Sequence, residues 1–311
     1  MISLIGLTKK FGPLTAVDGI TLEVGRGEVL GFLGPNGAGK STTMKMVTGF
    51  LLPTSGKAHV CGFDVEEKPI ESKKKIGYLP EGAPLYGDMT AEAFLNFIAE
   101  IRGFRGKEKK KRVARAVEQV EIGDVLLQPI ETLSKGFKRR VGLAQAILHD
   151  PEVLILDEPT DGLDPNQKHH VRKLISGMAK DKAIVISTHI LEEVDAVCTR
   201  VAVIAKGKLV FDGTPQALEA RSRTHNAVEI RLKPARAEEV RQGLSGVSSV
   251  ARVESGMELD GIANLLVIPK NGQSIVAEIS DFVRARGYPV EELLVSRGRL
   301  DDVFRDLTLR G

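Results

Sequence analysis

The stretch Gly34-Pro-Asn-Gly-Ala-Gly-Lys40-Ser41-Thr42 decides the fold of this chain. It fits the pattern Gly-x-x-x-x-Gly-Lys-Ser/Thr, and it stands between an apolar strand candidate at 29–33 and a helix candidate at 42–49. Glycines allow successive backbone N–H groups to point at one anion, and the helix N-terminus adds its dipole there. An accidental glycine-rich turn is the alternative, and the strand–loop–helix setting argues against it.

The stretch therefore predicts a phosphate-binding loop. Lys40 is expected to reach the β- and γ-phosphates of a nucleotide, and Ser41 is expected to hold Mg²⁺. We assign nucleotide binding to the whole loop, namely Gly34, Pro35, Asn36, Gly37, Ala38, Gly39, Lys40, Ser41 and Thr42.

Composition agrees with a soluble globular protein that has one large and one small domain. The 311 residues are 42% hydrophobic and 27% charged, and the net charge of +3 gives no strong field for nucleic acid. Two cysteines, Cys61 and Cys198, are too few for a disulfide framework. The N-terminus does not have the pattern of a secretory signal, and no apolar run reaches the ~20 residues of a membrane span.

The order of patterns predicts an α/β domain over residues 1–220. Alternating residues near the N-terminus predict antiparallel strands, and residues 88–150 predict a helical subdomain with Thr90 as an N-cap. The short apolar runs at 153–156, 183–187 and 201–205 are typical of parallel strands buried on both faces. The sheet core is therefore mixed, with an antiparallel β part and a helical part beside it.

A polar segment at 221–226 marks the expected start of a second domain, residues 221–311. Its strands and helices follow the order β-α-β-β-α-β, which is the plan of a ferredoxin-like α+β domain.

Two carboxylates end the apolar run at 153–156. The strand is expected to deliver Asp157 and Glu158 at its C-terminal end, where α/β proteins bind ligands. Asp157 is then placed to hold Mg²⁺ through water, and Glu158 is a candidate base for the attacking water.

The segment Leu133-Ser134-Lys135-Gly136-Phe137 stands just ahead of a predicted helix, so a hydroxyl, a backbone N–H and a dipole can converge on phosphate. A plain helix cap is the alternative. At this point the chain resembles the nucleotide-binding subunits of ATP-binding cassette (ABC) transporters, from residue 2 to about 215. The segment is similar to their Leu-Ser-Gly-Gly-Gln signature, with Ser134 and Gly136 kept.

The resemblance assigns roles to four further positions. Phe11 falls where the family stacks an aromatic ring on adenine, the alternative being an ordinary core phenylalanine. Val17 is counted with the nucleotide-binding residues. Asp164, in Gly-Leu-Asp, matches the D-loop that crosses to the partner subunit. His189 matches the switch histidine at the γ-phosphate.

One position departs from the family pattern. Glu81 stands where the family usually has a glutamine that contacts Mg²⁺ and the attacking water, and it adds a negative charge beside a triphosphate. We retain Glu81 as a catalytic and metal-binding candidate. Near it, Tyr86 and Met89 either form an exposed apolar patch for a membrane subunit or belong to the local core.

The resemblance implies an ATPase that uses ATP and Mg²⁺. In this family the signature of one subunit closes over the nucleotide of another, so a complete site needs two copies, or a paired cassette, about a two-fold axis. It also implies a membrane-spanning permease as partner, with this subunit peripheral at the cytoplasmic face of the inner or plasma membrane. The motifs resemble those of ABC-2 exporters, and nucleic acid is not expected as a partner. The alternative is a soluble ABC-type ATPase of DNA repair or translation, which typically carries coiled-coil arms, zinc modules or two cassettes.

Overall fold

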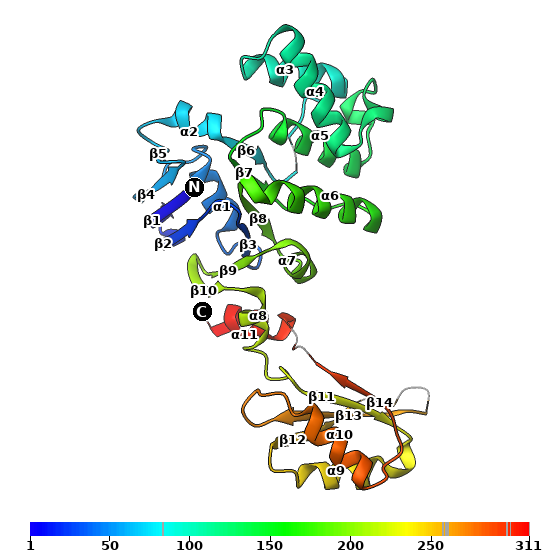
Figure 1. The fold of residues 1–311 in the computed structure, drawn as a ribbon. Helices are drawn as coiled ribbons and strands as arrows, with labels where there is room; N and C mark the ends of the chain where they lie inside the picture. The colour runs from blue at the N-terminus through cyan, green and yellow to red at the C-terminus, as the bar shows by residue number, and fades with distance from the viewer. Residues whose placement is uncertain (83, 257, 259–260, 297, 299, 311) are drawn as a thin grey trace. The chain divides into compact units, whose positions relative to one another are not determined.

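The computed structural model describes residues 1–82, 84–256, 258, 261–296, 298 and 300–310 (Figure 1). The chain divides into two compact units, one of residues 1–215 with the C-terminal end from Leu307, and one of residues 216–306. None of the helices within these described ranges is both long enough and apolar enough to cross a membrane.

The first unit contains an antiparallel sheet. Its strand order is β2-β1-β4-β5, with bounds β1 (Ile2–Phe11), β2 (Leu14–Val24), β4 (Ser55–Val60) and β5 (Phe63–Asp64). β1 pairs with β2 along its length, from Ile2 opposite Val24 to Phe11 opposite Leu14. The prediction of antiparallel strands near the N-terminus is confirmed.

A six-stranded sheet forms the centre of the same unit. Its order is β10-β9-β3-β8-β7-β6, with bounds β3 (Val29–Leu33), β6 (Ile76–Leu79), β7 (Val153–Asp157), β8 (Ala183–Thr188), β9 (Arg200–Ala205) and β10 (Lys208–Gly213). Every pair is parallel except β9 with β10. All residues of β3, β7 and β8 are buried, as the continuous apolar runs predict. The carboxyl ends of these three strands therefore meet at one edge, and the residues that follow them lie there.

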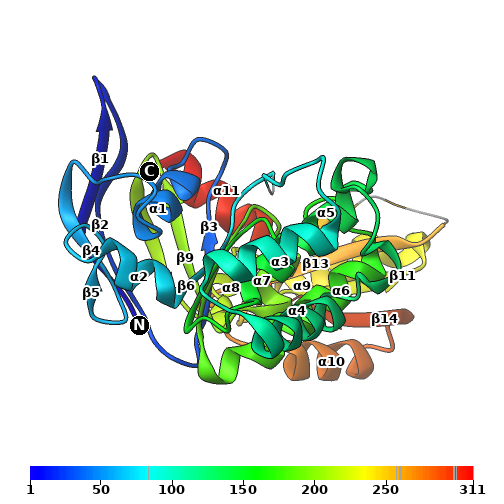
Figure 2. The ribbon, with the colours of Figure 1, turned by 90° about the horizontal axis from the view of Figure 1, so that it is seen from above.

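Helices cover both faces of the six-stranded sheet. α1 (Lys40–Val47) buries Met44 and Met46 in a core with residues of both sheets, such as Leu4 and Phe32. α6 (Pro165–Met178) buries Val171 and Ile175 in the other core, and α7 (Leu191–Val197) follows β8. Figure 2 shows α1 between the six-stranded sheet and the antiparallel sheet.

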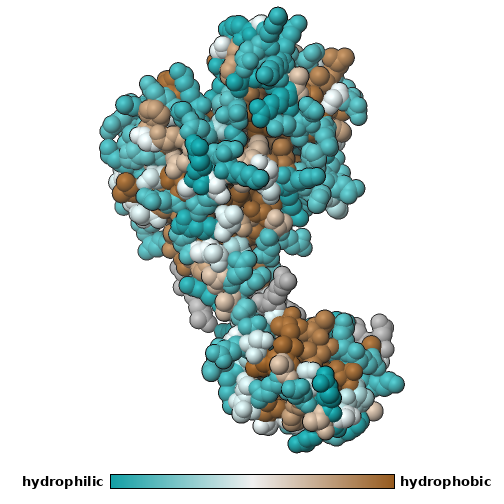
Figure 3. All heavy atoms as spheres, in the orientation of Figure 1, coloured by the Kyte–Doolittle hydropathy of each residue, from teal (hydrophilic) through white to brown (hydrophobic). Residues whose placement is uncertain are grey.

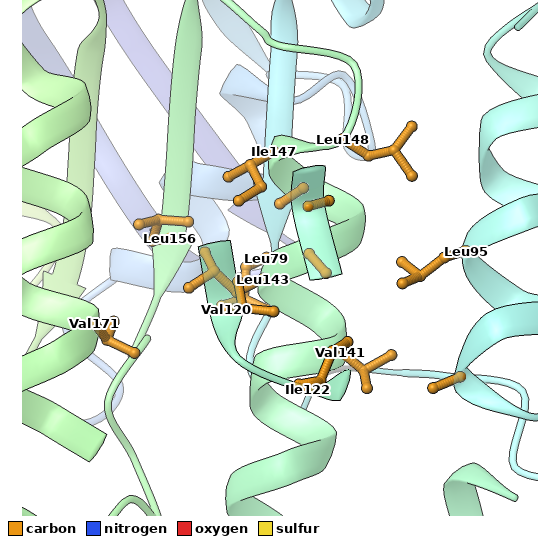
Figure 4. Close-up of a cluster of buried hydrophobic side chains, with 14 of the residues drawn as sticks. Leu79, Leu95, Val120, Ile122, Val141, Leu143, Ile147, Leu148, Leu156 and Val171 are labelled. Carbon is orange, nitrogen blue, oxygen red and sulfur yellow. The ribbon is translucent and has the colours of Figure 1, made fainter. Parts of the chain in front are cut away.

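The predicted helical subdomain consists of α3 (Ala91–Ile101), α4 (Gly106–Val120) and α5 (Lys135–Ile147). Thr90 caps α3 as expected, because its hydroxyl accepts the N–H of Ala93 at 3.1 Å. Figure 4 shows how one hydrophobic cluster joins these helices to the central sheet. It contains Leu95 of α3, Val141 and Leu143 of α5, Leu79 of β6 and Leu156 of β7.

Part of the apolar stripe on α3 does not enter this core. Phe94 is buried, but Phe97 is 39% exposed and Ile101 is 65% exposed. The face of the helical subdomain seen in Figure 3 is largely hydrophilic, with some apolar side chains among the polar ones. Exposed apolar side chains on a polar surface are typical of a binding surface.

The sequence analysis did not predict the helix α2 (Pro69–Lys75). The helix has Pro69 at its first position and three lysines in its last turn, and Ser72 is its one buried residue. Its apolar periodicity is therefore too weak to be recognised in the sequence.

The second unit has a four-stranded antiparallel sheet of order β12-β13-β11-β14. The bounds are β11 (Val228–Leu232), β12 (Val250–Ser255), β13 (Ala263–Pro269) and β14 (Val290–Val295). α9 (Ala237–Ser245) and α10 (Val276–Ala285) share its core through Val240 and Ile279. The strands and helices follow in the expected order β-α-β-β-α-β. α8 (Pro215–Glu219) and α11 (Leu300–Arg310) complete the chain.

Candidate nucleotide site

The loop at 34–39 has the backbone that a phosphate cradle requires. It leaves β3 and ends at Gly39, which precedes α1 in a left-handed conformation with φ 109°. A Cβ at Gly39 would lie 2.5 Å from the carbonyl oxygen of Ala16, and a Cβ at Gly34 would lie 2.5 Å from that of Ile204. Both positions therefore need glycine, Gly39 for its backbone angle and both for the close approach of a neighbouring chain segment.

Lys40 is buried, at 6% exposed, and its ammonium group is held by the loop itself. Its Nζ donates to the carbonyl of Gly34 at 2.6 Å and to that of Pro35 at 3.2 Å. Burial lowers the pKa of Lys40, while the nearby charges of Glu158, Asp157 and Glu81 act in the opposite direction. The side chain is thus preorganised beside the loop, and carbonyl groups are neutral partners that a phosphate can replace.

A cavity of about 300 Å³ opens over this loop. Carboxylates from two other elements reach it, Glu81 after β6 and Glu158 after β7. Its lining consists of Ala16, Asn36, Gly37, Gly39, Lys40, Ser41, Thr42, Glu81 and Glu158. The structure therefore brings the predicted loop and two of the predicted catalytic residues to one cavity. Gly34, Pro35 and Ala38 belong to the loop but are not part of this lining.

Glu158 and His189 are adjacent although they lie 31 positions apart in the sequence. His189 Nδ1 is 2.8 Å from Glu158 Oε1, and the histidine side chain is about half exposed. Glu158 has φ 49°, which is a strained backbone angle for a residue with a Cβ. Its N–H donates to the carbonyl of Ser187 at 2.9 Å, which fixes the turn that presents the carboxylate.

Asp157 ends β7 and is only 2% exposed. Its carboxylate accepts a hydrogen bond from the hydroxyl of Ser187 on the neighbouring strand. Mg²⁺ prefers a few carboxylate and hydroxyl ligands and takes its remaining ligands from water and phosphate. Asp157, Ser41 and Glu81 offer such oxygens from three segments, so the residues present fit this ion. The described residues contain no group of three or more His, Cys, Asp or Glu side chains that could hold a metal alone.

Phe11 and Val17 have different environments. Phe11 ends β1 and is 47% exposed, so it is not a core phenylalanine, and the ammonium of Lys9 lies 5.3 Å from its ring centroid. Val17 is fully buried beside Gly39, and its neighbour Ala16 lines the cavity in its place. Sequence reasoning missed Ala16, because what it contributes near the loop is a backbone carbonyl and not a recognisable side chain.

The signature segment and the D-loop form a second surface of the same unit. Ser134 caps α5, and its Oγ accepts the N–H of Phe137 at 3.3 Å. Asp164 caps α6, and Lys135 Nζ is 2.7 Å from Asp161 Oδ2, which ties the two segments together. Within the described part of the chain, neither Ser134, Gly136 nor Asp164 lines the cavity over the phosphate loop.

Glu193 is a buried acid that the sequence analysis did not select. Its carboxylate accepts hydrogen bonds from the hydroxyls of Thr160 and Thr188, the second at 2.8 Å, and burial raises its pKa. The N–H of Ile190 donates to Thr188 Oγ1 at 3.0 Å. Glu193 therefore holds the segment after Glu158 to the strand end that precedes His189. The sequence alone gives no signal for these two hydrogen-bond partners.

Comparison with known proteins agrees with this geometry. A family model described as ABC transporter matches residues 17–161. The probable multidrug ABC transporter ATP-binding protein YbhF of Escherichia coli (strain K12) is 40% identical over 217 residues, which cover 70% of this chain and 37% of that protein. The chain thus spans little more than a third of that relative's length.

Two further similarities cover more of the compared protein. The Nod factor export ATP-binding protein I of Ralstonia nicotianae is 31% identical over 311 residues, covering 100% of this chain and 94% of that relative. A solved structure described as the ATP binding subunit of an ABC transporter matches with a TM-score of 0.66 and 29% identity. The matched part covers 70% of this chain and 92% of the chain in that structure.

A phosphate loop, paired strand-end carboxylates and these similarities define an ATP-binding cassette. The chain belongs to the family of ABC transporter ATP-binding proteins, and it is related to members that serve multidrug and Nod factor export. The predicted family and the predicted α/β phosphate-loop domain are confirmed.

Proposed function

We propose that this chain is the ATP-binding and ATP-hydrolysing subunit of an ABC-2 type membrane exporter. The observation that carries the proposal is the cavity in which the phosphate loop, Glu81 and the His189-bound Glu158 meet. The exporter assignment is supported by the multidrug and Nod factor export relatives.

ATP is the substrate that the cavity fits best. The triphosphate accepts hydrogen bonds from the N–H groups of the loop, and Lys40 exchanges its two carbonyl partners for the β- and γ-phosphates. Bound Mg²⁺ supplies positive charge that offsets the charge of the phosphates. The loop thus positions the γ-phosphate below the carboxylate of Glu158.

Glu158 is the general base in this scheme. Its carboxylate orients the attacking water and accepts a proton from it. His189 is hydrogen-bonded to that carboxylate and is about half exposed. It would hold the Glu158 side chain toward the cavity and contact the γ-phosphate of bound ATP. Glu81 lines the same cavity and would hold Mg²⁺ or the water, in the role that the family gives to glutamine. Asp157 would hold Mg²⁺ through water.

Two copies of the chain are required for a complete site. Ser134 and Asp164 are exposed outside the phosphate cavity, and Gly136 is buried beneath them against Leu163 and Gln167. This segment would cap the nucleotide of a second copy or a paired cassette. Phe11 is exposed and stacks on the adenine ring. ATP then joins the two subunits, and hydrolysis releases them.

The permease partner is proposed to dock on an apolar groove of about 450 Å³ between the central sheet and the helical subdomain. Phe50, Ile70 and Ile101 line it and are 60–78% exposed. Tyr86 is 56% exposed beside Phe97, with ring centroids 5.9 Å apart, whereas Met89 packs against the core. A short amphipathic helix from a membrane-spanning subunit fits such a groove. With such a partner, the protein would act as a peripheral subunit at the cytoplasmic face of the inner or plasma membrane.

We further propose that residues 221–311 act as a separate accessory domain with a ferredoxin-like fold. The support is the strand order β12-β13-β11-β14 with two helices in the order β-α-β-β-α-β. Deletion of 221–311 should leave a folded ATPase, and unfolding of the truncated protein would contradict this boundary.

The proposed function is tested with purified protein, MgATP and a phosphate-release assay. The wild type should hydrolyse ATP, and Lys40→Ala should lose tight ATP binding. Lys45→Ala is the matched control, because Lys45 is an exposed lysine of the same helix. The Lys45→Ala protein should bind and hydrolyse ATP normally. Unchanged ATP affinity in Lys40→Ala would rule out the phosphate-loop assignment.

A further inference from the structure

Arg139 connects the helical subdomain to the catalytic edge of the sheet. It lies on α5, five residues after Ser134, and is 6% exposed. Its Nη1 donates to the carbonyl of Pro80 at 2.9 Å, and its Nη2 donates to the carbonyls of Asp157 and Glu158. Pro80 directly precedes Glu81, so one guanidinium group holds the backbone beside both carboxylates of the cavity.

The shape of the guanidinium explains why arginine suits this position. Its N–H groups form a rigid planar fork, which can bond to two chain segments at once, whereas a lysine ammonium is a single point of attachment. The two carbonyls on Nη2 flank the peptide that carries Glu158, whose φ of 49° needs support from its surroundings. Arg139 therefore restrains the backbone that aims Glu158 and, at the same time, the segment that carries Glu81.

The charge of Arg139 matters as well. Burial lowers its pKa, and the negative charges of Asp157, Asp161, Glu158 and Glu81 act against that shift. An arginine stays protonated in such a setting, so it contributes a permanent positive charge within a group of four carboxylates. Glu81 adds one of these charges at a position where its family relatives usually have a neutral glutamine.

We propose that Arg139 is a positioning residue for ATP hydrolysis, which aligns Glu158 and Glu81 through their backbones and offsets the charge of Glu81. The inference rests on the proposed ATPase function and deepens it. Because α5 belongs to the helical subdomain, Arg139 also links that subdomain to the backbone that carries both carboxylates.

The test measures kcat and KM for ATP in the wild type, R139Q, R139K, E81Q and the double variant E81Q/R139Q. A misplaced base predicts that R139Q lowers kcat by about 10- to 100-fold. The unbalanced charge of Glu81 predicts that R139Q also raises KM about tenfold, and that this increase falls below about threefold in the E81Q background. R139K keeps the charge and loses the fork, so KM should stay near the wild-type value while kcat falls.

Arg140 provides the matched control. It is the adjacent buried arginine of α5, and its Nη1 donates to the carbonyls of Val120 and Glu121 within the helical subdomain. R140Q should lower the melting temperature but keep kcat within about threefold of the wild type, because it does not touch the carboxylates. A loss of kcat in R140Q equal to that in R139Q would overturn the inference, since it would show a general effect of damaging α5.

The outcomes separate this inference from the proposed function. A wild type that does not hydrolyse ATP would count against the ATPase assignment itself. Two outcomes with an active wild type would overturn this inference but leave the ATPase assignment in place. One is an R139Q protein with unchanged kcat and KM. The other is an R139Q substitution that raises KM by the same factor in the wild type and in E81Q. If R139Q does not fold, R139K carries the test, and a folded R139K with wild-type kcat would contradict the positioning role.

Discussion

Replacement of Glu158 by glutamine separates chemistry from stability. Glutamine has nearly the same shape, so the strained turn at φ 49° and the contact with His189 can persist. What is lost is the carboxylate that accepts a proton. General-base catalysis contributes about 10²- to 10⁴-fold in rate, which corresponds to about 2.7–5.4 kcal/mol of activation free energy. We expect kcat to fall by this factor while ATP still binds.

The effect on folding should be much smaller. The side chain of Glu158 is 17% exposed and that of His189 is 51% exposed, so solvent screens their interaction. A hydrogen-bonded pair of this kind contributes about 1 kcal/mol or less, which shifts the melting temperature of a domain of this size by about 2–4 °C at most. The loss of rate therefore exceeds anything that partial unfolding of Glu158→Gln could cause.

The assay is phosphate release at saturating MgATP, with thermal unfolding measured on the same preparations. Glu192→Gln is the control, because Glu192 is an exposed acid near His189 that does not line the cavity. A Glu158→Gln protein that hydrolyses ATP at the normal rate would remove Glu158 as the base. A collapse of its melting temperature together with its rate would show a structural role.

Three further changes test other parts of the account. Phe11→Ala should raise KM for ATP by roughly 5- to 150-fold, from ~1–3 kcal/mol of stacking, whereas Phe50→Ala, at a more exposed phenylalanine outside the phosphate cavity, should not. Equal KM values in the two variants would refute the stacking. Ile101→Glu should abolish co-purification with the membrane subunit and leave the ATPase rate intact. Leu127→Glu, which lies outside the groove, should keep the complex. Retained binding by Ile101→Glu would exclude the groove as the docking site. Burial lowers the pKa of His149 to about 4 from 6.5, so its contribution to stability is complete above pH 6.5 and is lost as the pH falls toward 4. Unfolding in urea at pH 7 and pH 5 should show a loss of about 2 kcal/mol in the wild type that His149→Gln lacks, and identical losses would contradict the shift.

The parts of the fold that could be predicted are those in which a local pattern has one physical meaning. Gly34 and Gly39 could be identified because close backbone approach excludes any side chain there. The apolar runs around Leu30, Ile155 and Val185 could be identified as strands because a strand buried on both faces must be apolar throughout. The helix α2 could not be predicted, because its lysines lie on an exposed surface and form no apolar stripe.

The candidate site shows the same division. Asp157 and Glu158 were recognisable at the end of an apolar strand, but the contact of Glu158 with His189 depends on two strands meeting in the fold. Arg139 and Glu193 act on backbone carbonyls and hydroxyls of distant segments, and a single sequence carries no sign of such partners. The roles of Ser134, Gly136 and Asp164 stay predictions, because their proposed partner is a second copy of the chain.

The central claim is that two chains close around ATP, and mass measurement by light scattering tests it most directly. The Glu158→Gln protein should be a monomer without nucleotide and should reach twice the chain mass with saturating MgATP. Ser134→Arg added to that variant should return it to a monomer that still binds ATP. A Glu158→Gln protein that binds MgATP and remains monomeric would contradict the requirement for a second copy at the site.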